Sequence, residues 1–192
     1  GMPIFYTQIE DYEITEEGDL NFILAYDNVI QYQDGVKQNK LKVTYSKMED
    51  GVAHNKSIES LISEIEKDPT GTFTLTQNYD ASYLNASRNS IIPNTFRGTL
   101  NGNGYKIYNI NKPLFETLEG ATIKNLTLEN VNLLGANSKG SISNVAQNTT
   151  ISNVHIKGLD MTTGTNESGG MVGDMQSGCT VEESSVTKLH IK

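Results

Sequence analysis

A pattern of twelve residues, apolar at the second, fifth, seventh, tenth and twelfth positions, recurs three times in this chain, with Ser184 at the fifth position of the third copy as the one exception. Successive copies begin 28 and 30 residues apart, and they align with one another without gaps. Repeats of about 20–50 residues are typical of solenoids, in which each unit stacks on its neighbours. The copies at residues 122–133, 150–161 and 180–191 therefore predict a stacked, repetitive fold.

The order of residues within each copy predicts a right-handed parallel β-helix. Short runs of alternating apolar and polar residues favour strands, and the breaks in the alternation predict corners between them. Equivalent residues of successive coils would then stack about 4.8 Å apart. Two structural ladders are expected, one apolar and facing the interior, the other of asparagine at a corner: Ile123, Ile151 and Val181, and Asn125 with Asn153.

One amphipathic helix is predicted before the repeats, at about residues 58–67. Apolar residues recur there at i, i+3, i+4 and i+7, which places them on one face of a helix. Pro69 disfavours helix at Asp68 and ends the segment. We expect this helix to cap the N-terminal end of the β-helix, which would otherwise expose apolar side chains and strand edges. The apolar face consists of Ile58, Leu61, Ile62 and Ile65, and Ser57 is the predicted N-cap.

The N-terminal part of the chain differs from the rest in charge and composition. Residues 1–70 hold 14 acidic and 6 basic side chains, whereas residues 71–192 hold 9 of each. Such a shift is typical of a domain boundary. Strand-like runs at residues 20–26 and 40–45 predict a small antiparallel β-module at 1–56, followed by the β-helix and its capping helix at 57–192. Gly1 and Met2 are typical of the scar of an expression tag.

Composition narrows the function to a binding or structural module. The chain has 192 residues and a net charge of −8, which argues against nucleic acid as a partner because phosphate binding needs clustered Lys and Arg. No apolar run approaches the length of a membrane helix, so no membrane contact is expected. The single cysteine, Cys179, excludes an internal disulfide and a multi-cysteine metal site. No cofactor is expected in this chain.

Several motifs of residues 57–192 resemble streptococcal IgA-specific zinc metalloproteases. The order of these motifs is the specific part of the resemblance, and the repeats with Ile-x-Asn-Leu/Val resemble the GLUG repeats of the same proteins. Residues 1–56 show little of it and are assigned by position alone. The motifs that carry the resemblance are residues 65–76, residues 96–107, Pro113-Leu114-Phe115 and residues 169–173.

The resemblance implies a large virulence protein of a Gram-positive bacterium, secreted or attached to the cell wall. In that family, a C-terminal gluzincin-like domain binds zinc and cleaves the host glycoprotein, which is the IgA1 heavy chain for the name-giving members. The region that this chain resembles lies upstream and is a non-catalytic scaffold that engages the substrate. The resemblance therefore implies two kinds of partner, the host glycoprotein and other domains of the parent chain.

The histidines argue that this chain is not itself the protease. Zinc proteases of this class need two histidines four residues apart with a glutamate between them, as in H-E-x-x-H. None of the three histidines has such a partner, so zinc is expected only in a catalytic domain elsewhere in the parent protein. The histidines are His54, His155 and His190.

Two other functions remain as alternatives. A surface adhesin could use the same repeats without any protease, and the parent gene would then encode a wall anchor without H-E-x-x-H. A β-helical carbohydrate-active enzyme would need convergent carboxylates. The aspartates of the repeat region are far apart in sequence, which disfavours that enzyme: Asp80, Asp160 and Asp174.

Tyrosines and arginines near the first coils are the candidate partner contacts. Tyr and Arg are enriched at the energetic centres of interfaces. Core packing, or plain exposure without a partner, is the alternative interpretation for the tyrosines. The candidates are Tyr79, Tyr83, Arg88, Arg97, Tyr105 and Tyr108.

Overall fold

The structure is a computed structural model that describes most of the chain. The chain divides into a smaller unit, residues 1–57 with 85–87, and a larger unit, residues 58–84 with 88–192. The described residues are 7–14, 20–26, 31–33, 36–38, 40–45, 48–49, 52–53, 58–82, 84, 88–134, 140–162 and 167–192.

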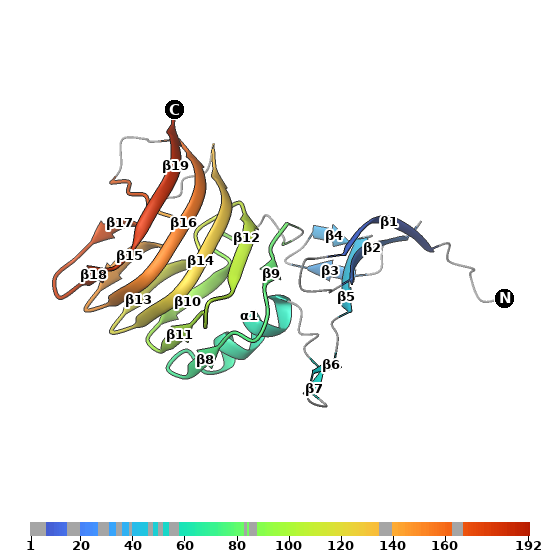
Figure 1. The fold of residues 1–192 in the computed structure, drawn as a ribbon, viewed down its shortest axis with the longest axis horizontal. Coiled ribbons are helices and arrows are strands. Elements are labelled where there is room, and N and C mark those ends of the chain that lie inside the picture. Colours follow the sequence, from blue (N-terminus) through green and yellow to red (C-terminus); the bar gives the residue numbers. More distant parts are fainter. Residues whose placement is uncertain are drawn as a thin grey trace. The chain divides into compact units, whose positions relative to one another are not determined.

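The smaller unit contains a three-stranded antiparallel sheet, which confirms the antiparallel module predicted from the sequence (Figure 1). Thr44 Oγ1, on an edge strand, donates a hydrogen bond of 2.7 Å to Asn21 Oδ1 on the central strand. The sheet, in the order β1-β2-β5, consists of β1 (Thr7–Ile14), β2 (Leu20–Tyr26) and β5 (Lys40–Tyr45). Two short antiparallel pairs join β3 (Gln31–Gln33) to β4 (Val36–Gln38) and β6 (Met48–Glu49) to β7 (Val52–Ala53).

The larger unit is a β-solenoid of about four turns, as the repeats predicted (Figure 1). Its strands pair in parallel, and the chain passes in each turn from a four-stranded sheet to an eight-stranded sheet. The four-stranded sheet contains β10 (Ile92–Phe96), β13 (Phe115–Glu119), β15 (Ser143–Gln147) and β17 (Val172–Met175). The eight-stranded sheet contains β8 (Thr72–Thr74), β9 (Tyr79–Asp80), β11 (Thr99–Asn101), β12 (Lys106–Ile110), β14 (Thr122–Leu133), β16 (Thr150–Met161), β18 (Thr180–Glu182) and β19 (Ser185–Ile191).

Residues in the left-handed conformation explain the unequal spacing of the apolar positions. A strand alone would place every second side chain inside. One left-handed residue turns the chain and shifts this alternation by one position, so the inward residues of β14 are separated by three, two, three and two positions. At the first corner these residues are Asn125 (φ 54°), Asn153 (φ 52°) and Glu183 (φ 49°), and at the second they are Asn130 (φ 52°), Gly158 (φ 82°) and Lys188 (φ 53°).

Asparagines at the first corner are hydrogen-bonded from coil to coil. Asn153 Nδ2 donates to Asn125 Oδ1 at 3.0 Å, and Asn125 Nδ2 donates to Asn101 Oδ1 at 3.2 Å. Asparagine enters the left-handed region more readily than most residues, so it satisfies the backbone and the ladder together. The equivalent bonds at the second corner join Asn130 to Asn109 at 2.7 Å and Asn109 to Asp80 at 3.1 Å.

Apolar residues at matching registers form the core of the solenoid. Ile123 pairs with Ile151, and Ile151 pairs with Val181. Ile123 and Ile151 are 0% and 1% exposed. Each such side chain contributes about 1.5–3 kcal/mol to folding when it leaves water.

The single helix of the described residues, α1 (Ile58–Lys67), has the bounds predicted from the sequence. Its apolar face belongs to the same core as the strands, and the helix contacts β10. In each later coil, a strand of the four-stranded sheet precedes the strand of the eight-stranded sheet. In the first coil α1 takes the place of that strand, because it directly precedes β8, and it covers one end of the solenoid (Figure 1). The predicted N-cap, Ser57, lies outside the described residues.

Substitution of Asn125 should separate the two roles of the corner asparagine. Asn125→Ala removes the ladder bonds and forces a Cβ-bearing apolar residue into the left-handed region, with an expected loss of about 2–4 kcal/mol. Asn125→Gly removes the same bonds but keeps the backbone conformation accessible, so we expect it to be about 1 kcal/mol more stable than the alanine variant. Urea denaturation measures both values. Wild-type stability of the alanine variant would contradict this account of the corner.

Candidate functional site

The tyrosines predicted as partner contacts lie in different environments. Tyr79, on β9, is 4% exposed and belongs to the core, so its side chain offers a partner little surface. Tyr105 is partly buried against that core. Tyr108, on β12, follows the buried residue Ile107 and is itself partly exposed. Tyr83 lies outside the described residues.

Both arginines of the predicted set form ion pairs. Arg88 Nη1 lies 2.8 Å from Glu66 Oε1 on α1, with both side chains about one-third exposed. Arg97 Nη2 lies 2.9 Å from Glu119 Oε2, with both side chains about half exposed. Arg97 follows β10 of the four-stranded sheet, whereas Tyr108 lies on the eight-stranded sheet. The predicted residues are therefore distributed over the larger unit, and their role as contacts stays a prediction.

The environment of Tyr79 changes its acidity. Burial, together with the smaller effect of the nearby negative charge of Glu64, raises the pKa of the Tyr79 phenol to about 12. The neutral phenol is therefore the form that the core accommodates.

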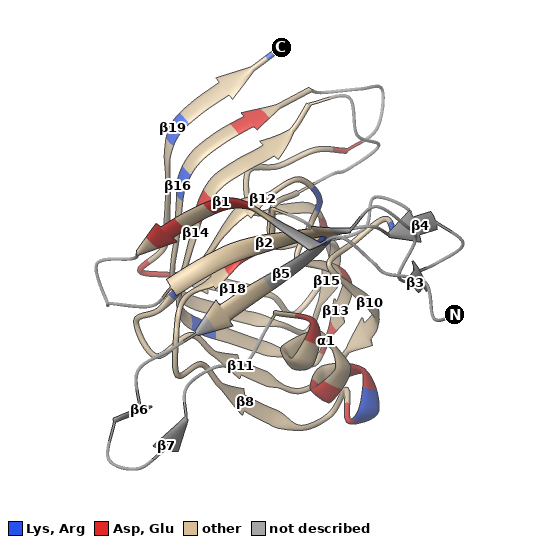
Figure 2. Ribbon diagram, turned by 90° about the vertical axis from the view of Figure 1, so that its right-hand side faces the viewer, with Lys and Arg blue, Asp and Glu red and all other residues tan. Residues whose placement is uncertain are grey.

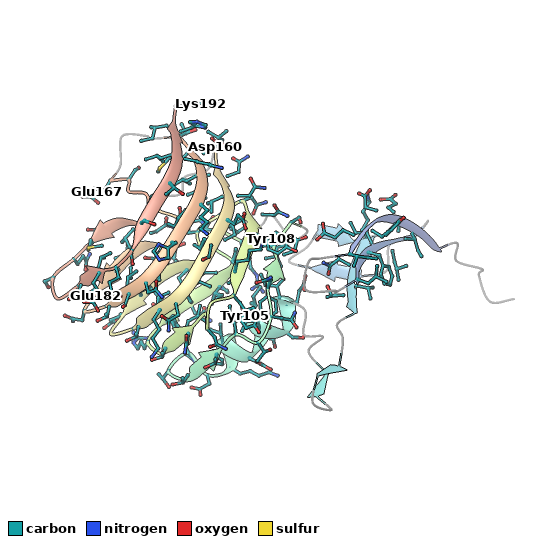
Figure 3. The ribbon with its side chains drawn as sticks, in the orientation of Figure 1. Tyr105, Tyr108, Asp160, Glu167, Glu182 and Lys192 are labelled. Atoms are coloured by element: carbon teal, nitrogen blue, oxygen red, sulfur yellow. The ribbon has the colours of Figure 1, made fainter. Side chains whose placement is uncertain are left out.

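Polar side chains face outward on one part of the eight-stranded sheet, where β12, β14, β16 and β19 lie side by side. We call it the β12–β19 face and define it by the outward residues of β12, β14, β16 and β19. Figure 3 marks Tyr108 and Asp160, which belong to it. Its three columns, aligned by strand register, are Lys106–Thr127–His155–Ser185, Tyr108–Glu129–Lys157–Thr187 and Asn132–Asp160–His190.

Lys106 connects two columns of this face. Its Nζ lies 3.0 Å from Glu129 Oε2 and 5.3 Å from the centroid of the Tyr108 ring. The ammonium group is thus attracted both to a carboxylate and to the electron-rich face of an aromatic ring. Exposed pairs of this kind contribute at most about 1 kcal/mol to stability, so their larger effect is to orient the Tyr108 ring.

His155 is held between two neutral polar groups. Its Nδ1 lies 2.7 Å from Ser185 Oγ, and its Nε2 lies 2.9 Å from Asn153 Oδ1. The amide oxygen accepts, so Nε2–H donates, and Nδ1 accepts from the serine hydroxyl. The arrangement resembles a hydrolase triad only in outline, because Asn153 has no negative charge to stabilise an imidazolium and already bonds to Asn125. We interpret it as an extension of the asparagine ladder.

The described residues do not fit a catalytic zinc ion. They contain no group of three or more His, Cys, Asp or Glu side chains that could hold a metal. His190 Nδ1 pairs with Asp160 Oδ1 at 3.0 Å, with exposures of 77% and 48%, while His54 lies outside the described residues. No step of zinc chemistry is therefore assigned to them. Among the same residues, no helix is long and apolar enough to cross a membrane.

Charges of both signs are mixed along the strands of the larger unit. Figure 2 shows a blue and a red segment on β16 and a blue segment on β19. Glu129, Lys157, Asp160 and Lys188 are the charged residues of these three strands that follow their first corner. A mixed face of this kind favours hydrogen bonding to a polar partner over attraction of one charge sign.

The sequence analysis did not identify most residues of the β12–β19 face as candidate contacts. Thr127, His155 and Ser185 occupy the sixth position of the three repeats, and Glu129, Lys157 and Thr187 occupy the eighth. The repeat alignment therefore contained the signal, because equivalent positions of stacked coils lie side by side.

Comparison with known proteins gives consistent matches. A family model described as the M26 IgA1-specific Metallo-endopeptidase N-terminal region matches residues 9–158. Immunoglobulin A1 protease of Streptococcus pneumoniae serotype 4 (strain ATCC BAA-334 / TIGR4) is 39% identical over 110 residues, covering 54% of this chain and 6% of that protein. Immunoglobulin A1 protease of Streptococcus sanguinis is 38% identical over 120 residues, covering 59% and 6%. Zinc metalloprotease ZmpC of the same pneumococcal strain is 26% identical over 161 residues, covering 80% and 9%.

A solved structure supports the same fold. A protein described as IgA1 Protease matches with a TM-score of 0.55 and 23% identity, over 97% of this chain and 19% of that chain. At that identity the likeness bears on the fold alone, and it agrees with the β-solenoid and the small antiparallel sheet. The chain spans less than a tenth of the length of the curated relatives described above.

Tyr79→Phe should protect the protein at alkaline pH. The folded pKa of about 12 lies above the ordinary value of 10.0, so the contribution of the neutral phenol is complete below pH 10 and lost as the pH rises towards 12. At pH 11 the wild type should have lost about 1.4 kcal/mol relative to Tyr79→Phe, because one pKa unit corresponds to about 1.4 kcal/mol. Urea denaturation at pH 8 and pH 11 measures the difference. Tyr108→Phe serves as the control, and parallel losses in wild type and Tyr79→Phe would contradict the prediction.

Proposed function

Because the chain belongs to the M26 IgA1-specific metalloendopeptidase N-terminal region family, we propose that it is a non-catalytic module of a cell-surface zinc metalloendopeptidase. It acts as a scaffold and engages the substrate glycoprotein. The observation that carries this proposal is the family match, which covers residues 9–158 and refers to the N-terminal region of the proteases. The donor set of the described residues, which does not fit zinc, supports the non-catalytic part.

The packing of the solenoid suits a scaffold. Side chains of successive coils interlock at fixed register, and asparagine hydrogen bonds join neighbouring coils at the corners. Close-packed interiors deform little, so the module keeps attached groups at a constant distance. Zinc and the cleavage chemistry belong to another region of the full-length protein, which is secreted or attached to the wall of a Gram-positive cell.

The β12–β19 face suits contact with a glycoprotein. Tyr108 and Lys106 provide an aromatic ring and a cation, and His155, Ser185 and Asp160 provide donors and acceptors. Glycoprotein surfaces offer hydroxyl and amide groups, which such a mixed face can bind. The proposed substrate is the IgA1 heavy chain, since the relatives are named as immunoglobulin A1 proteases.

The purified chain should not cleave IgA1, with or without added zinc. Its described residues provide no metal-binding group, and peptide hydrolysis by zinc needs three protein ligands and a bound water. Mass spectrometry of the IgA1 heavy chain after incubation measures cleavage, with the pneumococcal IgA1 protease as the positive control. Zinc-dependent heavy-chain fragments produced by this chain would refute the non-catalytic assignment.

The chain should bind IgA1 through the β12–β19 face. The double variant Tyr108→Ala/Lys157→Ala should weaken binding about tenfold, since loss of a central interface residue costs more than about 1 kcal/mol. Biolayer interferometry with immobilised IgA1 measures the Kd, and circular dichroism checks the fold of each variant. Glu119→Ala, on the four-stranded sheet, is the control and should bind like the wild type. Equal affinity of the double variant and the wild type would exclude this face as the contact surface.

A further inference from the structure

Large apolar side chains are exposed on the last coil of the solenoid. Met175, Val181, Leu189 and Ile191 are 48%, 40%, 42% and 56% exposed. They lie on β17, β18 and β19, which Figure 1 shows at the end of the solenoid opposite α1. The two ends of the solenoid therefore differ: one is covered by a helix, and the other presents an apolar surface.

The same positions are buried in the preceding coils. Leu189 follows Val131 and Leu159 in register, and both of these are 1% exposed. Three other columns show the same change, with the exposed fraction of each earlier residue given in brackets. Val181 follows Ile123 (0%) and Ile151 (1%). Ile191 follows Leu133 (0%) and Met161 (2%), and Met175 follows Leu118 and Ala146 (both 0%). The last coil thus presents the surface that each earlier coil buries under its successor.

The backbone of the last coil also keeps the outline of the earlier coils. Its corner residues Gly178, Glu183 and Lys188 have φ values of 78°, 49° and 53°, in the left-handed region like the equivalent corners before them. In the part of the chain that the structure describes, β17, β18 and β19 each pair with a strand on one side only. Natural sheet edges are normally protected by charges, prolines or a covering element. The inward positions of this coil remain apolar instead, except for Ser184, which follows Leu126 and Val154 in the repeat.

We propose that the last coil is an interior coil, and that a further β-coil of the full-length protease stacks on it in parallel register. The coil junctions already present in this chain show what fits: strands parallel to β17, β18 and β19, with apolar side chains directed at Met175, Val181 and Leu189. The segments that match this chain make up only 6% and 9% of two of the relatives, so those proteins have the residues to supply such a coil. A second copy related by a two-fold axis would bring antiparallel strands together and lose the stacking of corner over corner.

The test compares two polypeptides of the same gene: the present chain, and one extended at its C-terminus by about 60 residues. Leu189→Ala should lower the Tm of the present chain by less than about 2 °C, because the side chain is already partly exposed. In the extended polypeptide the same substitution should lower the Tm by about 5–15 °C, as for a buried leucine. Leu159→Ala, in the same column but buried, is the matched control and should lower the Tm substantially in both.

Hydrogen exchange gives a second readout that does not depend on a variant. Backbone amides of β17–β19 should exchange at least about 100-fold more slowly in the extended polypeptide, because their edges become paired. Equal Leu189→Ala effects in both polypeptides, unchanged exchange, or a reading frame that ends at Lys192 would overturn the proposal. So would a dimer, measured by light scattering, that Leu189→Asp dissociates and that persists in the extended polypeptide. The inference rests on the family membership but not on substrate binding, so it can fail while IgA1 binding is retained.

Discussion

Left-handed residues at the corners are the constraint on which the rest of the solenoid depends. Asn125 and Asn153 turn the chain and shift the alternation of side chains by one position, so that Leu126 and Val154 again face inward. Without that shift, the following apolar residues would face water. The side chains of the same asparagines bond across the coils, which ties the position of each corner to that of its neighbour. The same residues thus determine both the path within a coil and the register between coils.

That register also determines the chemistry of the outer surface. Because equivalent positions lie side by side, a polar residue in one coil meets residues about 28 and 30 positions away, as Ser185 meets His155. The resulting surface is a set of columns on an open sheet. Such a surface suits the recognition of another macromolecule through many modest contacts better than the enclosure of a small substrate, which needs a concave, water-excluding pocket.

The repeat made the strands of the larger unit predictable. The side-chain environments that were not predicted lie in the earlier coils, where the sequence shows no clear repeat. The positions of β14 and β16 coincide with the first two repeats, and the helix bounds follow from one amphipathic face ended by Pro69. Tyr79 lies in an earlier coil where the strands are short and the pattern is too brief to show which side chains face inward. The ion pair of Arg97 with Glu119 joins residues 22 positions apart. It depends on the register of β10 with β13, which no repeat in the sequence indicates. Sequence alone therefore located the strands better than the partners of their side chains.

The difference between the two ends has a consequence for the proposed contact surface. In a solenoid each coil is stabilised chiefly by its neighbours, so a coil with one neighbour opens more readily than a coil with two. Tyr108 and Lys106 lie on β12, between β9 and β14, whereas His190 lies on β19, which pairs only with β16 among the described strands. Residues of a binding surface must keep their mutual geometry to avoid an entropic loss on binding. The part of the β12–β19 face around Tyr108 is therefore the preorganised part, and the part around His190 becomes equally rigid only when a further coil supports β19.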